Sequence, residues 1–211
     1  PQIWHRTSAL LLVAFVLLAA VFALKITGDR SVLPYVVPAA AVGLLLAVLL
    51  DAGAALMVTG MLALLGGAIV GNVEFAAYLM FGGVAGTIVV RRGEKFSHFI
   101  QAAVAIAVVQ IGVVTLFTLL GGDRDVAGYS ELVGAALASA AGSAVAALGS
   151  FVILGNAFGI TTSFRLLELA NPSQPLLRRL MFEAPGTYHH SLMVGNLAER
   201  AAEAIDADPL L

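Results

Sequence analysis

The segment "HFIQAAVAIAVVQIGVVTLFTLL", residues 98–120, decides the fold class of this protein. After its first residue, His98, it contains no ionisable side chain. About 20 consecutive apolar residues in a helix are enough to cross the hydrocarbon core of a bilayer. The segment therefore predicts a membrane-spanning helix.

The composition of the whole chain agrees with this prediction. Of its 211 residues, 60% are hydrophobic and 11% are charged, and the mean hydropathy is +0.99. A soluble domain has about 45–50% apolar and about 25% charged residues. The net charge of -2 does not favour DNA or RNA as a partner. The absence of cysteine excludes disulfides and thiolate metal sites.

Six stretches without charged side chains are long enough to span a membrane. They cover residues 7–24, 33–50, 52–70, 75–90, 98–120 and 132–158. Asp51 divides the second stretch from the third, because a carboxylate is costly at the centre of a bilayer. The expected fold is thus all-α, a polytopic bundle of six spans in a lipid bilayer.

Lysine and arginine in the connecting segments predict the orientation of the bundle, since they favour the cytoplasmic side. With a cytoplasmic N-terminus, the inside segments hold Arg6, Arg91, Arg92, Lys95, Arg165, Arg178, Arg179 and Arg200, and the outside segments hold Lys25, Arg30 and Arg124. The strongest element is "RRGEK", residues 91–95, which directly follows a span. We expect both ends of the chain to be cytoplasmic.

The last part of the chain differs from the rest, since ten of the 24 charged residues fall in the last 51 positions. Asn-Pro at 171–172 and Pro-Gly at 185–186 predict breaks between short helices. We expect a membrane domain over 1–159, linker helices over 160–184 and the start of a further domain over 185–211. The chain opens on Pro1 and stops within a helical pattern, so both ends are expected to be cut.

Small residues recur at every fourth position in two of the spans. They are Gly82 and Gly86 in the fourth span, and Gly134, Ala138, Gly142 and Ala146 in the sixth. Such stripes let helix backbones approach closely, so we predict helix packing. The spacing does not tell whether the partner helix lies in the same chain or in a second copy, which leaves a homo-oligomer open.

Polar side chains within the spans allow two interpretations. Gln110, Thr115 and Thr118 could line a ligand pocket, although such groups more often hydrogen-bond between helices. The ionisable residues Asp51, Glu74, His98 and Glu131 all lie at span edges. Ion-coupled transporters place ionisable groups at membrane depth, so a permease is disfavoured.

Two adjacent histidines begin an amphipathic helix in "EAPGTYHHSLMVGNLAERAAEAI", residues 183–205. The residues that follow His190 at helical spacing are apolar: Val194, Leu197, Ala198, Ala201 and Ile205. Those that follow His189 on the same helix are mostly polar. His190 is thus predicted to point into the core of whatever domain follows. A single imidazole cannot hold a divalent ion, so these residues alone favour a structural histidine.

Thr187 is the predicted N-cap, and Arg200 is predicted to pair with Glu203.

Residues 158–205 resemble the junction in bacterial seven-transmembrane receptors with an intracellular HD-type phosphohydrolase domain. The most specific parts are "LLELANPSQPLLRRL", residues 166–180, and "EAPGTYHHSLMVGNLAE", residues 183–199. This family includes cyclic di-AMP phosphodiesterases of the PgpH type. The resemblance implies a bacterial inner-membrane protein whose N-terminal anchor, extracytoplasmic domain and first of seven spans precede this chain.

The resemblance also implies a role for the histidines. His190 matches the first metal ligand of the HD domain, His189 is the less favoured candidate, and the remaining ligands would lie beyond Leu211. A pair of transition metals, iron or manganese, would then activate water for attack on a cyclic dinucleotide. The chain alone is expected to be inactive and to bind no metal. The alternatives are a non-enzymatic membrane anchor, sensor or oligomerisation module and, less favoured, a permease.

Overall fold

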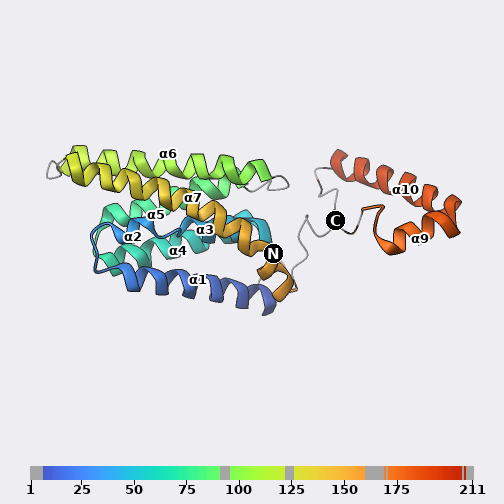
Figure 1. Cartoon of the computed structure of the whole chain (residues 1–211), viewed down its shortest axis with the longest axis horizontal. Coiled ribbons are helices and arrows are strands. Elements are labelled where there is room, and N and C mark those ends of the chain that lie inside the picture. The colour runs from blue at the N-terminus through green and yellow to red at the C-terminus, as the bar shows by residue number, and fades with distance from the viewer. Residues whose placement is uncertain are drawn as a thin grey trace. The chain divides into compact units, whose positions relative to one another are not determined.

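The computed structural model describes residues 7–90, 96–121, 126–159, 169, 171–205 and 207. It divides the chain into two compact units, Pro1–Ile160 and Thr161–Leu211 (Figure 1). Within the described residues all regular structure is helical. The basic cluster at 91–95 and the first predicted linker helix fall outside the described residues.

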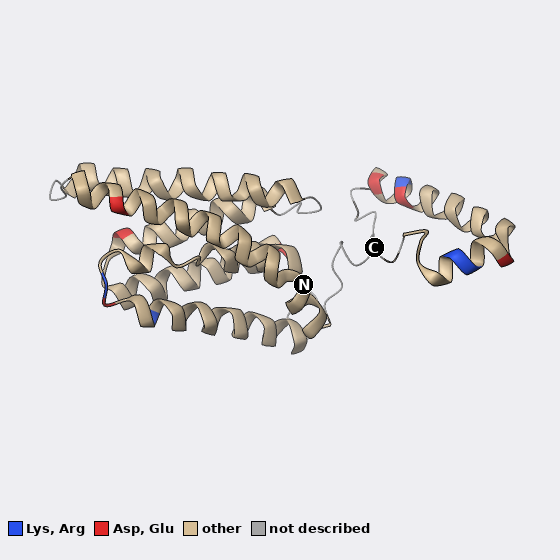
Figure 2. Cartoon of the chain, viewed as in Figure 1, with Lys and Arg blue, Asp and Glu red and all other residues tan. Residues whose placement is uncertain are grey.

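Five helices of the first unit are long and apolar enough to cross a membrane. They are α1 (Thr7–Thr27), α4 (Ala52–Val70), α5 (Val73–Val90), α6 (Phe96–Gly121) and α7 (Val126–Ala157). On α1, the large side chains of Leu11, Leu18 and Phe22 are exposed, as expected for a surface in contact with lipid. The described charged residues of this unit lie toward helix ends and loops (Figure 2). The predicted all-α membrane bundle is confirmed.

The second predicted span, residues 33–50, is not one continuous helix. It consists of α2 (Leu33–Val36) and α3 (Ala40–Leu49), which are separated at Val37 and Pro38. Proline has no backbone N–H and disfavours the α conformation of the residue before it. Val37 accordingly has φ -58° and ψ 126°. The predicted span at 33–50 is therefore made of two helices, because Pro38 interrupts it.

Helix α3 forms the centre of the membrane unit. Nine of its ten residues are buried, and it packs against α1, α4, α5 and α7. Gly43 permits this packing, because a Cβ atom there would lie 2.7 Å from Thr87 Oγ1 and 2.9 Å from Thr59 Oγ1. Helix α3 is thus the core of the bundle and has little surface left for lipid.

Local capping fixes both ends of α4. Asp51 precedes the helix in an extended conformation, and its Oδ1 accepts a hydrogen bond of 2.9 Å from Ala54 N. This confirms that Asp51 divides two helices. At the other end Gly71 adopts φ 72°, which favours glycine, and Asn72 Oδ1 accepts from Glu74 N at 2.9 Å. The chain therefore reverses direction between α4 and α5 within two residues.

The second unit contains a pair of helices, α9 (Pro175–Glu183) and α10 (Pro185–Ala204), separated by Ala184 alone. Because Pro185 suits the first helical position, α10 starts earlier than the sequence predicted. Thr187 consequently lies inside the first turn, and its predicted N-cap role was wrong, since Ala184 takes that position without a side-chain cap. The ion pair found on α9 joins Arg179 Nε to Glu183 Oε1 at 2.8 Å.

Candidate functional site

The two adjacent histidines lie in the first turns of α10. Both His189 and His190 are exposed, whereas the preceding residue, Tyr188, is 8% exposed. The ring of Tyr188 meets that of His189 edge-on, with 5.9 Å between the centroids. Sequence reasoning did not predict that Tyr188 is buried on α10, although an aromatic residue close to the turn between two helices could have suggested it.

The apolar stripe that starts at His190 is uncovered among the described residues. Val194, Leu197 and Ile205 are 52%, 70% and 77% exposed. A helix with such a face is stable chiefly when another element covers it. The burial of His190 against a following domain stays a prediction.

The described residues do not hold a metal ion by themselves. They contain no group of three or more His, Cys, Asp or Glu side chains placed to bind one. His190 would offer one imidazole nitrogen, while a transition-metal site needs several ligands. Any metal centre that uses His190 must therefore draw at least part of its other ligands from outside the described residues.

Two side chains satisfy backbone carbonyls at the break between α2 and α3. Tyr78 Oη on α5 donates to the carbonyl of Tyr35 at 2.9 Å, and Ser139 Oγ on α7 donates to the carbonyl of Val37 at 3.0 Å. Carbonyls released from a helix need such partners within a membrane. Phe75 completes the cluster, with its ring centroid 4.9 Å from that of Tyr35. The break is thus fixed by α5 and α7.

Two of the three polar residues predicted on the fifth span, Gln110 and Thr115, contact neighbouring helices. Gln110 on α6 is 1% exposed and packs against Gly82 on α5, where a Cβ atom would lie 2.8 Å from Gln110 Nε2. The hydroxyls of Thr115 and Tyr129 on α7 lie 3.0 Å apart. Thr118 Oγ1 donates to Val114 O at 2.8 Å. Thr115 thus makes the interhelical bond that the packing interpretation expects.

The predicted stripes of small residues lie in different environments. Gly82 and Gly86 face α6, where a Cβ atom on Gly86 would lie 2.8 Å from Ile106 Cδ1. On α7, Gly142 is close to Pro38, whereas Gly134, Ala138 and Ala146 are exposed. The face of α7 that is buried within the chain follows a second stripe, Ala135, Ser139, Ser143 and Ala147. Sequence reasoning missed this second stripe, although its spacing is the same.

Comparison with known proteins gives the family. The family described as "7TM receptor with intracellular HD hydrolase" matches residues 1–162. Two relatives carry the name cyclic-di-AMP phosphodiesterase PgpH. The one from Bacillus subtilis is 33% identical over 84% of this chain and 26% of its own length. The one from Listeria monocytogenes is 32% identical over 64% of this chain and 19% of its own length.

The chain therefore spans about a quarter or less of these relatives. No solved structure gives a significant match. The family match covers the whole membrane unit, including the broken span that forms its core. The chain belongs to the family of seven-transmembrane receptors with an intracellular HD hydrolase.

Proposed function

We propose that this chain is the membrane and linker part of a receptor-type phosphodiesterase that hydrolyses a cyclic dinucleotide, cyclic di-AMP, in the cytoplasm. The proposal depends on the similarity of this chain to two relatives that are named as cyclic-di-AMP phosphodiesterases. The alignment with the relative from Bacillus subtilis covers 84% of this chain. The membrane unit would receive a signal and pass it through α9 to the hydrolase domain. Lysine and arginine placement supports cytoplasmic ends in the bacterial inner membrane.

In this proposal His190 supplies the first metal ligand of the hydrolase domain, and His189 is the less favoured candidate. An exposed imidazole one turn into α10, at the start of an uncovered apolar face, is accessible to a domain that packs on that face. HD hydrolases depend on divalent metals, and iron or manganese suits histidine and carboxylate ligands. Because the chain contributes one such ligand, we expect it to be inactive alone.

Hydrolysis of cyclic di-AMP by the full-length protein tests the proposal. The protein in nanodiscs, supplied with manganese or ferrous iron, should convert cyclic di-AMP to a linear product that chromatography resolves. The chain of 211 residues in the same nanodiscs is the control and should leave the substrate intact. A full-length protein that folds and binds metal but leaves cyclic di-AMP unchanged would contradict the proposal.

A further inference from the structure

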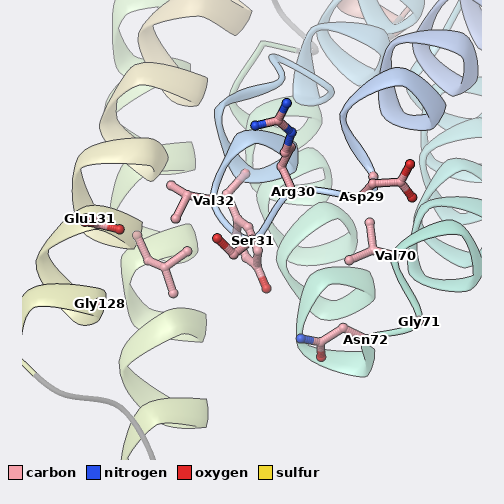
Figure 3. A pocket seen from close by; sticks show the side chains of 12 residues that line it. Asp29, Arg30, Ser31, Val32, Val70, Gly71, Asn72, Gly128 and Glu131 are labelled. Atoms are coloured by element: carbon pink, nitrogen blue, oxygen red, sulfur yellow. The ribbon is translucent and has the colours of Figure 1, made fainter.

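A cavity of about 670 Å³ lies at one end of the membrane unit (Figure 3). Three segments form its walls: residues 28–32 after α1, residues 70–72 between α4 and α5, and the first turns of α7. Ligand pockets have volumes of about 300–1,000 Å³, so a small molecule fits. In the proposed orientation this end faces the outside of the cell.

Charged groups of both signs line the cavity. Asp29 and Arg30 come from the segment after α1, and Glu131 comes from α7. Glu131 projects from α7 across the cavity from the side chain of Asn72 (Figure 3). Ser31 lies between these two walls in the same view. The described lining thus offers carboxylates, a guanidinium and neutral polar groups from separate elements.

The cavity has a rigid inner wall. Tyr35 and Leu132 are 3% and 5% exposed, so they close the cavity toward the core of the bundle. The Tyr35 ring packs edge-on against Phe75 and Tyr78, and its carbonyl accepts from Tyr78 Oη. Preorganisation of this kind lowers the entropic cost of binding.

Helix α7 connects the cavity with the opposite end of the membrane unit. It runs without interruption from Val126 to Ala157 and carries Glu131 near its start. Two turns further on, Ser139 Oγ donates to the Val37 carbonyl at the break in the core. A ligand that binds Glu131 therefore contacts a helix that also holds the broken segment and continues to the opposite end of the membrane unit.

We propose that this cavity binds a small zwitterion with the chemistry of a free amino acid, its ammonium group at Glu131 and its carboxylate at Arg30, whose exposed side chain turns toward Glu131 from the direction drawn in Figure 3 when the ligand binds. A simple anion is disfavoured, because the described lining holds two carboxylates and one guanidinium. A metal ion is disfavoured, because no three His, Cys, Asp or Glu side chains converge among the described residues. The apolar side chains of Val32 and Val70 leave room for a nonpolar substituent.

Binding can be tested on the full-length protein in nanodiscs. The probes are the standard L-amino acids, with putrescine as an ammonium compound that lacks a carboxylate and acetate as a carboxylate that lacks an ammonium group. At least one amino acid should raise the melting temperature and give a saturable titration, whereas putrescine and acetate should not. The proposal would be overturned if none of the amino acids raised the melting temperature. It would also be overturned if putrescine bound with the same affinity as the amino acid that binds best.

Matched variants locate the site. Glu131→Gln should weaken the binding of that amino acid about tenfold or more, since it removes a charge-assisted hydrogen bond. Asp51→Asn makes the same charge change at the far end of α4 and should leave the affinity unchanged. Unaltered affinity in Glu131→Gln would overturn the assignment. If that variant does not fold, Arg30→Gln should give a similar loss, and unaltered affinity there would equally overturn it.

The role of this cavity as the receptor's input rests on the proposed function, but the binding experiment does not. It detects a ligand without any hydrolysis, so its failure is distinguishable from a failure to cleave cyclic di-AMP. A protein that binds an amino acid through Glu131 and cleaves no cyclic dinucleotide would refute the proposed function alone.

Discussion

Replacement of Gly43 by alanine should loosen the core of the membrane unit. The new methyl group would lie 2.7 Å from Thr87 Oγ1, 2.9 Å from Thr59 Oγ1 and 3.3 Å from the Gly83 carbonyl oxygen. Ordinary contacts to a Cβ atom begin at 3.4 Å, so the first two distances are short by several tenths of an ångström. The three atoms belong to α4 and α5, and relief requires α3 to move away from both helices.

Rotation of the Thr59 side chain does not remove its part of this conflict. The methyl group of Thr59 already lies so close to Gly83 that a Cβ atom there would clash with it. Threonine in a helix is also restricted in χ1. Overpacking of a well-packed core costs about 1–3 kcal/mol. We therefore expect Gly43→Ala to lower the free energy of unfolding by about this amount, even though alanine favours the helix more than glycine does.

Thermal unfolding of the protein in one detergent measures the effect, with Gly112→Ala as the matched control. Gly112 lies in α6 with no atom within 4 Å of its Cβ position, so that variant should be as stable as the wild type or more stable. Adding Thr87→Ala to Gly43→Ala removes the closest oxygen and should restore part of the loss. If Gly43→Ala melts together with Gly112→Ala, the described packing of α3 is wrong.

Two further variants test the groups that fix the helix ends and the break. Tyr78→Phe removes the donor to the buried Tyr35 carbonyl and should cost about 1 kcal/mol in detergent unfolding, whereas an unchanged midpoint would show that the bond does not contribute. Asp51→Ala removes the N-cap of α4 and should cost about 1 kcal/mol, while Asp51→Asn should retain most of the stability because asparagine also caps helices. Equal loss in both Asp51 variants would point to the charge instead of the cap.

The all-α membrane fold could be predicted from the sequence because nearly every side chain of a span is apolar. The hydropathy of the whole span therefore does not depend on any single residue. Asp51 marked a helix boundary correctly, since the cost of a carboxylate in lipid and its capping geometry favour the same position. Pro38 indicates a break in the helix, but it lies within an apolar stretch. A criterion based only on the length of uncharged stretches does not detect such a break. The structure shows the break in the backbone at Val37, and Tyr78 and Ser139 donate to the carbonyls beside it.

The packing face of α7 could not be chosen from spacing. Ala135, Ser139, Ser143 and Ala147 repeat every four residues just as the predicted stripe does, and the tertiary contacts decide between the two. The cavity at the end of the bundle was missed for a related reason. Glu131 was treated as a span edge, whereas α7 begins five residues earlier at Val126 and brings this carboxylate beside Asn72 and the segment after α1.

The most direct test of the account is the metal content of the full-length protein with one histidine replaced at a time. His190→Ala should lose bound iron or manganese together with cyclic di-AMP hydrolysis, while His189→Ala, changed at the neighbouring position of the same helix, should lose much less of both. Elemental analysis per protein molecule, on material whose melting curve matches the wild type, gives the answer. A His190→Ala protein with the metal content of the wild type would contradict the assignment of His190 as a ligand.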